Sequence, residues 1–330
     1  MNRLLSHLLA VALLPVIAPA QDRATTLFAC SRDAAVVVRA TVVAATDPSP
    51  DWHRLEFRAD EVLKGGVEPA FFLMEPAGAC CGRSLFALAP GDRCLLFLRR
   101  TGATLHPLGG ARGVLSDDAA VVAHVRTLLS TANSDVTAVL VAALDATDAR
   151  IANDAAEALA VLPVLAPGAA DRLRLVDALV RAVQTGRTAA APLADAVARL
   201  QDPAMLDALA VTYLSTPRDD QAGLLRRAFA RCDADSLLGI VPTDATDTAR
   251  QLRAAQLFAE LPMDRAAPVL RTMLVTTPCP KVKLCTAEAL LGAGASADEL
   301  RNAMPAEVLE LALRRRDTAK TFRSIRPARP

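Results

Sequence analysis

A short helical motif recurs through the second half of the chain and constrains the fold more than any other feature of the sequence. Each clear copy places small residues one helical turn before a leucine. The copies are NDAAEALAVLP (153–163), APLADAVARLQ (191–201), QLRAAQLFAELP (251–262) and KLCTAEALLGAG (283–294). The leucines 162, 200, 261 and 291 are 38, 61 and 30 residues apart, and AGLLRRAFARC (222–232) divides the long step. A repeat of roughly 30 residues in paired helices is typical of an α-solenoid.

Start and stop signals divide this region into short helices. Proline follows a capping residue at Asp202-Pro203 and at Thr216-Pro217, as at the first turn of many helices. Further starts are marked at Ser116, Ser134 and Thr147, and stops at Pro163, Gly186, Pro262 and Gly292. We therefore expect five or six helix pairs over 116–316; the alternative is an irregular helical bundle.

The segments CPKVKLCTAEALLGAG (279–294) and QLRAAQLFAELP are the best matches to a known repeat. Over 135–316 the chain resembles HEAT repeats, especially the short bacterial kind named after phycobilisome lyases. The resemblance implies an architecture and a role in binding a protein partner, with the concave face of the solenoid as the first candidate surface. It does not imply chromophore lyase activity, because the N-terminus predicts export.

The first region has a different composition. Trp52 and six of the nine phenylalanines precede residue 117, and aromatic and β-branched residues favour strands. Strands are predicted at 35–45, 54–63, 70–75, 93–100 and 103–108. Several short strands in a region of this size indicate a small barrel or sandwich. The fold class is therefore β followed by α: a small β-barrel-like domain over 21–115, then the solenoid, with the boundary near Leu115.

Specific residues carry a second resemblance in this region. Cys30 precedes the first strand, the pattern F-x-x-D-E-V-L-K-G spans 57–65, Cys81-Gly82 precedes Phe86, and Gly91 leads into CLLFL. Over 28–110 the chain resembles the netrin-like or TIMP-like OB-fold domains of secreted bacterial proteins. Metalloprotease inhibitors of this kind bind zinc through a mature N-terminal cysteine. Because Cys30 lies inside the predicted mature N-terminus, the resemblance implies the fold, and an inhibitor-like role is kept only as an alternative.

The N-terminus predicts export. The segment MNRLLSHLLAVALLPVIAPA has an early Arg3, an apolar centre and a final Ala18-Pro19-Ala20, which is typical of a secretory signal peptide over 1–20, cleaved after Ala20. The apolar run is shorter than the ~20 residues of a membrane span, and no later segment is long enough. We expect a periplasmic or extracellular protein without an integral membrane segment after cleavage.

Charge gives no reason to expect a nucleic-acid partner. The chain has 37 basic and 36 acidic residues, so its net charge is near zero. The exception is RRRDTAKTFRSIRPARP (314–330), in which seven positive charges oppose Asp317. We expect 317–330 to be a basic, flexible tail; the alternative is a contact with an acidic partner or with lipid head groups.

No motif identifies catalytic, metal-binding or cofactor-binding residues. The sequence has no C-x-x-C, no H-E-x-x-H and no G-x-S-x-G. Cys80, Cys81 and His106 could supply three zinc ligands, and Cys81 could form a thiol dyad with His53 or His106. We expect oxidised cysteines instead, and a non-enzymatic protein with no cofactor. The rival hypothesis is a hydrolase or thiol-dependent enzyme centred on the first region.

The seven cysteines of a protein that we expect to be exported should mainly form structural disulfide bonds. In the first region, Cys30 could bridge Cys81, and Cys80 could then bridge Cys94. From the lengths of the closed loops, the first bridge would stabilise the fold by roughly 4 kcal/mol and the second by roughly 3 kcal/mol. The pairing of Cys30 with Cys80, and of Cys81 with Cys94, is nearly as good. In the repeats, Cys279 could bridge Cys285, or either could meet Cys232. The odd total leaves at least one thiol unpaired or bonded to another chain.

Overall fold

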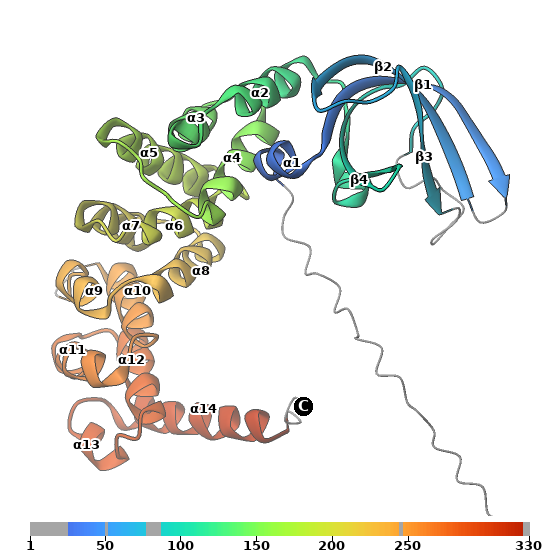
Figure 1. The fold of residues 1–330 in the computed structure, drawn as a ribbon. Helices are drawn as coiled ribbons and strands as arrows, with labels where there is room; N and C mark the ends of the chain where they lie inside the picture. Colours follow the sequence, from blue (N-terminus) through green and yellow to red (C-terminus); the bar gives the residue numbers. More distant parts are fainter. Residues whose placement is uncertain (1–25, 50–51, 77–86, 244–246, 326–330) are drawn as a thin grey trace, which may run out of the picture. The chain divides into compact units, whose positions relative to one another are not determined.

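The computed structural model describes residues 26–49, 52–76, 87–243 and 247–325. The chain divides into two compact units, Met1–Asp118 and Ala119–Pro330 (Figure 1). The first unit contains an antiparallel β-sheet, and the second consists of helices. The order of β-structure followed by α-structure agrees with the prediction from composition.

The sheet of the first unit is built around one long strand. Its strands are β1 (Val36–Ser49), β2 (Trp52–Lys64), β3 (Ala70–Pro76), β4 (Arg93–Thr101), β5 (Thr104–Pro107) and β6 (Val114–Ser116). They lie in the order β3-β2-β1-β4-β5, with β6 also paired to β4, and every pair is antiparallel. The edge strands β3 and β5 also contact each other. Strands β1–β5 correspond to the five predicted segments.

Three short elements of this unit were not predicted: helix α1, the 3₁₀ turn η1 and strand β6. Helix α1 (Leu27–Asp33) precedes the sheet, and the Thr26 hydroxyl accepts a hydrogen bond from the backbone N–H of Ala29 at 3.0 Å. The 3₁₀ turn η1 (Gly110–Gly113) leads into β6. Cys30 lies on α1, ahead of the first strand.

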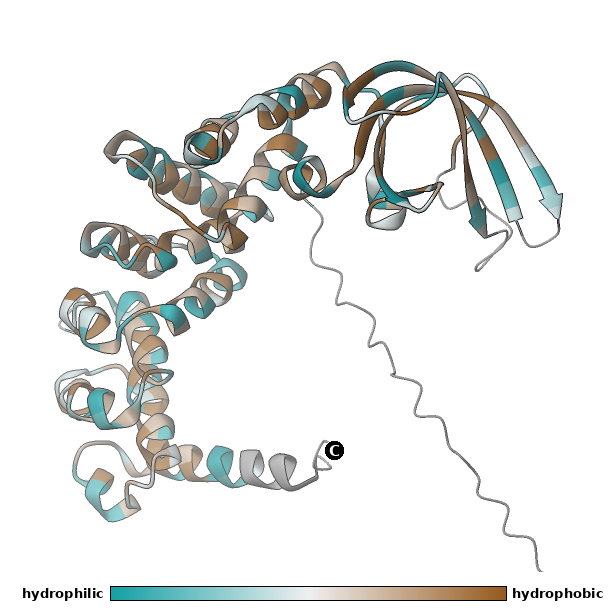
Figure 2. Ribbon diagram, in the orientation of Figure 1, coloured by the Kyte–Doolittle hydropathy of each residue, from teal (hydrophilic) through white to brown (hydrophobic). Residues whose placement is uncertain are grey.

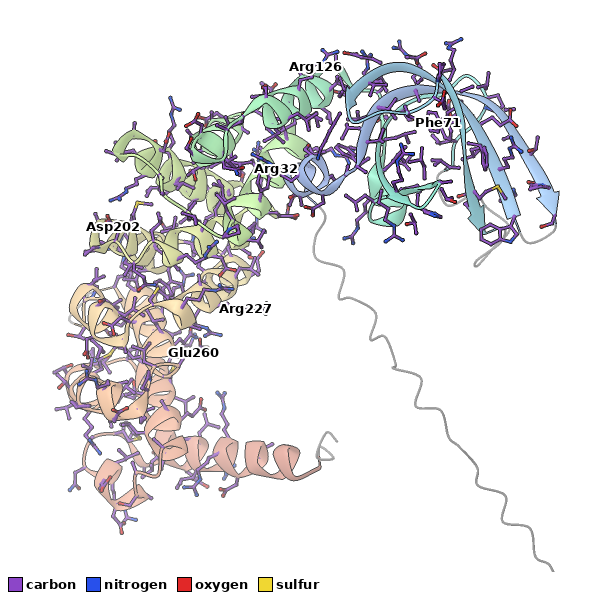
Figure 3. The ribbon with its side chains drawn as sticks, viewed as in Figure 1. Arg32, Phe71, Arg126, Asp202, Arg227 and Glu260 are labelled. Carbon is purple, nitrogen blue, oxygen red and sulfur yellow. The ribbon has the colours of Figure 1, made fainter. Side chains whose placement is uncertain are left out.

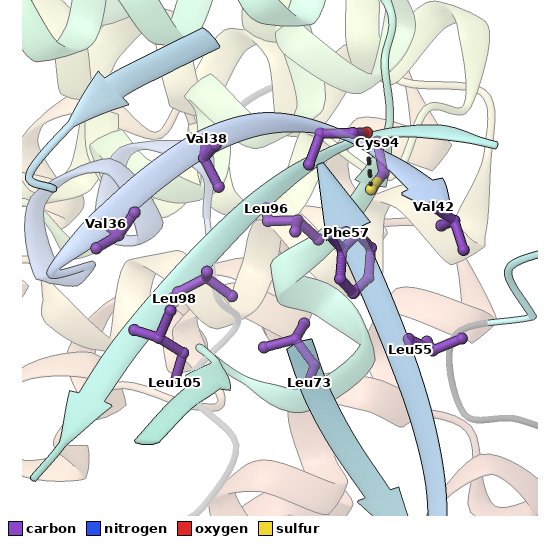
Figure 4. Close-up of a cluster of buried hydrophobic side chains, with 11 residues drawn as sticks. Val36, Val38, Val42, Leu55, Phe57, Leu73, Cys94, Leu96, Leu98 and Leu105 are labelled. Carbon is purple, nitrogen blue, oxygen red and sulfur yellow. Dashed lines mark hydrogen bonds between the residues drawn. The ribbon is translucent and has the colours of Figure 1, made fainter. Parts of the chain in front are cut away.

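Alternating side chains of β1, β2 and β4 form the core of the first unit (Figure 4). Val36, Val38, Phe57 and Leu96 are buried there, and Phe57 stacks on Phe71 with ring centroids 5.3 Å apart. Side chains at every second position of a strand point to the same face, so these residues cover one side of the sheet.

A glycine closes the turn after β2. Gly65 has a φ of +72°, and a Cβ atom there would lie 2.1 Å from the carbonyl oxygen of Ala35. Neither the dihedral angle nor the space suits a side chain. At the adjacent Gly66 a Cβ atom would meet nothing within 4 Å.

The second unit begins with α2 and continues as helices in two rows (Figure 1). The odd row consists of α3 (Val136–Ala143), α5 (Ala169–Thr185), α7 (Pro203–Ser215), α9 (Ala234–Ile240) and α11 (Met263–Thr276). The even row consists of α4 (Ala149–Val161), α6 (Ala190–Arg199), α8 (Asp219–Ala228), α10 (Thr248–Phe258) and α12 (Pro280–Gly292). The other elements are α2 (Ala119–Ser130), η2 (Asn133–Asp135), η3 (Phe229–Arg231), α13 (Ala297–Arg301) and α14 (Ala306–Ile325).

Most helices of the two rows pack both on a helix adjacent in the chain and on an adjacent helix of their own row. Contacts join α3 to α4 and α5, α6 to α7 and α8, and α12 to α11 and α10. Both hydrophobic and hydrophilic residues are distributed along the helices (Figure 2), as expected for helices with one buried side.

All five predicted copies of the repeat lie on the even row, on α4, α6, α8, α10 and α12. The small residues of the motif are buried, among them Ala155, Ala194, Ala254 and Ala287, each 0% exposed. Alanine at these positions lets the even helices pack closely against their neighbours because it has no side chain beyond Cβ.

The predicted helix starts were partly right. Asp202 is the N-cap of α7, and its carboxylate accepts hydrogen bonds from the N–H groups of Ala204 and Met205. The start predicted at Thr216-Pro217 was wrong, because α8 begins two residues later at Asp219. At α4 the N-cap is Asp148 rather than Thr147. At α4 an aspartate takes the capping position that the pattern assigned to threonine, whereas Thr216 is the C-cap of α7 and the N-cap of α8 is Arg218.

Part of the segment predicted to be a flexible tail from 317 lies in a helix, and its flexibility stays a prediction. Helix α14 continues to Ile325 and packs on α12 and α13. The run of basic residues did not interrupt the helix because arginine and lysine are good helix formers.

Basic side chains cap the C-terminal ends of several helices from a distance. Nη1 of Arg199 on α6 donates to the carbonyl of Ala160 at 2.6 Å, and its Nη2 donates to that of Leu162 at 2.5 Å. Nζ of Lys283 on α12 donates to the carbonyl of Ala303, just after α13, at 2.7 Å. The last carbonyls of a helix lack hydrogen-bond partners within the helix, and these cations supply the missing donors.

None of the helices described is both long and apolar enough to cross a bilayer.

Candidate functional site

The cysteine cluster of the first region is only partly described. Cys80 and Cys81 fall outside the described residues, so the bridges, the zinc site and the thiol dyad that involve them stay predictions. Cys94 lies on β4 in the core, where its thiol donates to the carbonyl of Ala40 at 3.5 Å (Figure 4). Burial, with nearby acidic groups, raises the pKa of Cys94 to about 12. A thiol with such a pKa stays protonated at neutral pH and is a poor nucleophile.

The cysteines of the repeats are present as thiols. Cys279 is the N-cap of α12, and Cys285 lies within the same helix, but no bridge joins them to each other or to Cys232. Burial raises the pKa of both Cys232 and Cys285 to about 11. Their pairing remains a prediction about the oxidised protein.

The predicted histidines lie on different strands. His53 on β2 pairs with the carboxylate of Asp47 at the end of β1, and His106 lies on β5. Within the described ranges, no group of three or more His, Cys, Asp or Glu side chains is arranged to hold a metal ion.

A groove interrupts the even row between α8 and α10. Other neighbours in this row, α6 with α8 and α10 with α12, pack directly, whereas α8 and α10 make only slight contact. A cavity of about 330 Å³ occupies the space between them. Its size falls in the lower part of the range for small-ligand pockets. We call this cavity the α8–α10 groove.

Each wall of the groove is one face of a helix. The lining residues are Asp219, Ala222, Gly223 and Arg226 of α8, Ala249, Leu252, Arg253 and Gln256 of α10, and Tyr213 of α7. Both helices contribute positions i, i+3, i+4 and i+7, which lie on one side of an α-helix. Three of these residues are alanine or glycine, so the helices leave space that larger side chains would fill.

Tyr213 and Arg253 hold the groove in place through a reciprocal contact. The Tyr213 hydroxyl donates to the carbonyl of Arg253 at 3.0 Å, and Nη1 of Arg253 donates to the carbonyls of Tyr213, Leu214 and Thr216. Tyr213 is almost fully buried, and this burial raises its pKa well above the usual value. Arg253 therefore completes the end of α7 and has little capacity left for a ligand.

Arg226 is placed differently. Its Nε lies 2.9 Å from Oε1 of Glu260, and its side chain is 32% exposed. Within the described part of the chain, no other group bonds to its guanidinium, so the edge formed by Nη1 and Nη2 is unused. The side-chain amide of Gln256 across the groove likewise forms no hydrogen bond with any residue that the structure describes. The site thus offers a planar cation and an amide beside an apolar surface.

Sequence reasoning missed this groove. Arg226 and Arg227 are adjacent and identical in type, but Arg226 lines the cavity whereas Arg227 is exposed (Figure 3). The one available signal was Gly223, because a glycine inside a helix is unfavourable unless space is needed beside it.

No protein-family model matches this chain, and the comparison with curated proteins finds no significant similarity.

Proposed function

We propose that the chain is an exported, non-enzymatic protein that binds another protein along the even row of its helical unit. We interpret this unit as a HEAT-like α-solenoid. Two observations support this interpretation: the sequence repeat falls on alternate helices, and helices pack on the next member of their own row.

We further propose that the first unit is an OB-like barrel. The strand order β3-β2-β1-β4-β5, with contact between the edge strands β3 and β5, is the order expected when a five-stranded sheet of this type closes on itself. In such a protein the sheet unit would accompany the binding surface rather than supply a catalytic centre.

The proposal that the helical unit binds a protein rests on the α8–α10 groove. Neighbouring even helices elsewhere pack directly on one another, whereas α8 and α10 enclose a cavity that is lined in part by polar groups without partners among the described residues. Open grooves between adjacent helices are common sites for a segment of a partner protein.

A glycine substitution tests the proposal. At Gly223 a new Cβ atom would meet nothing within 4 Å, so Gly223→Leu should fold normally and fill the groove. Gly239 on α9 is equally open and lies outside the groove, which makes Gly239→Leu the matched control. Capture of partners from the exported fraction of the source cells should fail for Gly223→Leu and persist for Gly239→Leu. Equal capture by both variants would contradict the groove as the binding surface.

The rival hypothesis of a thiol-dependent enzyme depends on Cys81. Alkylation of the native protein followed by peptide mapping tests it directly. Rapid labelling of Cys81 would favour the enzyme, and protection of Cys81 would favour the proposed disulfide.

A further inference from the structure

We propose that the α8–α10 groove recognises an acidic side chain of the partner, with the carboxylate bound to the Nη1–Nη2 edge of Arg226. This inference rests on the proposed function and names the chemistry that the groove selects.

The geometry of Arg226 supports a carboxylate. A guanidinium has two edges that can each bind a carboxylate through parallel hydrogen bonds. Glu260 contacts Nε at 2.9 Å and leaves the second edge unused. The same contact restrains the guanidinium, so less freedom is lost when a ligand binds.

The surroundings of Arg226 favour an amino-acid side chain over a larger ligand. Ala222, Ala249 and Leu252 offer an apolar surface for the methylene groups of aspartate or glutamate, and the Gln256 amide can donate to a second oxygen. A volume of about 330 Å³ is smaller than one turn of an α-helix with its side chains. The groove therefore suits one extended segment of polypeptide.

The local charge does not favour a ligand more highly charged than a carboxylate. Two guanidinium groups, of Arg226 and Arg253, face two carboxylates, of Asp219 and Glu260, so the groove is balanced overall. Asp219 is fully exposed, and its carboxylate lies 3.4 Å from Nη2 of Arg253. Attraction to the two guanidinium groups and repulsion from the two carboxylates both increase with the charge of the ligand, so the groove gives a doubly charged phosphate no electrostatic advantage over a carboxylate.

A pair of peptides tests this inference on the full chain. The probes are two fluorescently labelled, capped pentapeptides that carry a central glutamate or a central glutamine between alanine and leucine residues. Fluorescence anisotropy should show binding of the glutamate peptide at least tenfold tighter than that of the glutamine peptide. Arg226→Met should remove this preference, whereas the adjacent Arg227→Met should keep it. Arg226→Lys retains the positive charge but has no planar edge with two donors, so this variant should also bind the glutamate peptide weakly.

Three results would overturn the inference: no binding of the glutamate peptide to the native chain, equal binding of the two peptides, or equal behaviour of Arg226→Met and Arg227→Met. Far-UV circular dichroism shows whether each variant is folded. If Gly223→Leu abolishes partner capture while Arg226→Met does not, the proposed function stands and only the carboxylate preference fails. If both variants capture the partner normally, the proposed function fails as well.

Discussion

Replacement of Arg253 by methionine should strongly destabilise the helical unit. Arg253 is buried, and Nη1 donates to three carbonyls at the end of α7. Methionine keeps much of the apolar stem but provides no donor. The loss of one hydrogen bond from a charged group costs about 1.5–3 kcal/mol, and the loss of a cation at a helix C-terminus costs about 0.3–1 kcal/mol more. Since Asp219 is fully exposed, its carboxylate is not left buried without a partner. We therefore expect a loss of about 3 kcal/mol.

Arg250→Met is the matched control. Arg250 lies one turn earlier on α10, is exposed, and has a single ion pair with Asp247 at 3.8 Å. Surface pairs of this kind contribute little, so the free energy of unfolding should change by less than about 0.5 kcal/mol.

Urea denaturation can assign the effect to the correct unit. Far-UV circular dichroism follows the helices, and fluorescence of Trp52, the single tryptophan, follows the first unit. With a slope of about 3 kcal/mol/M, the helical midpoint of Arg253→Met should fall by about 1 M while the Trp52 midpoint stays unchanged. Equal helical midpoints for Arg253→Met and Arg250→Met would refute the assignment of Arg253 as a buried cap.

Three further predictions concern single positions. Gly65→Ala should destabilise the first unit by at least about 1–3 kcal/mol, because Gly65 has a positive φ and lies close to the carbonyl of Ala35. The control Gly66→Ala should leave the stability unchanged or raise it slightly. Trp52 fluorescence during urea unfolding measures both effects. Burial lowers the pKa of His124, so stability should fall as the pH drops below about 6.5, and His124→Gln should remove that dependence from the helical midpoint. Burial raises the pKa of Tyr213, so the buried hydroxyl should contribute fully to the free energy of unfolding below about pH 10. This contribution should be lost as the pH rises above about 10. Because Tyr213 is the single tyrosine, absorbance of tyrosinate should rise only as the helices unfold; ionisation near pH 10 in the folded protein would contradict this.

The helices that carry the predicted repeat copies, and most of the strands, could be predicted because they depend on local patterns. Buried alanines recur along the even helices, and the Asp202-Pro203 pair marks a helix start through its own hydrogen bonds. The start at Asp219 was missed because the earlier Thr216-Pro217 fits the same local rule. Prediction from local patterns therefore locates elements better than it locates their ends.

The groove and the state of Cys94 could not be predicted in this way. Both depend on which residues distant in sequence come together: α8 with α10 across α9, and Cys94 with Ala40 in the core. Nothing local distinguishes Arg226 from Arg227, and helical phase decides which of the two lines the cavity. A cysteine count indicates possible bridges but not which thiols the fold buries.

The caps provided by Arg199 and Lys283 have a consequence for how such a chain can change in length. The end of α4 is completed by a cation on α6, some 40 residues later, so one repeat is not a self-contained module. Deletion of α6 alone would remove a buried helix and also leave the carbonyls of α4 without their donor. A viable deletion must join α4 to another helix that carries a basic residue at the corresponding position. Helices of the even row can therefore be removed from this chain only by cuts that preserve the pairing between the end of α4 and a cation on a following helix.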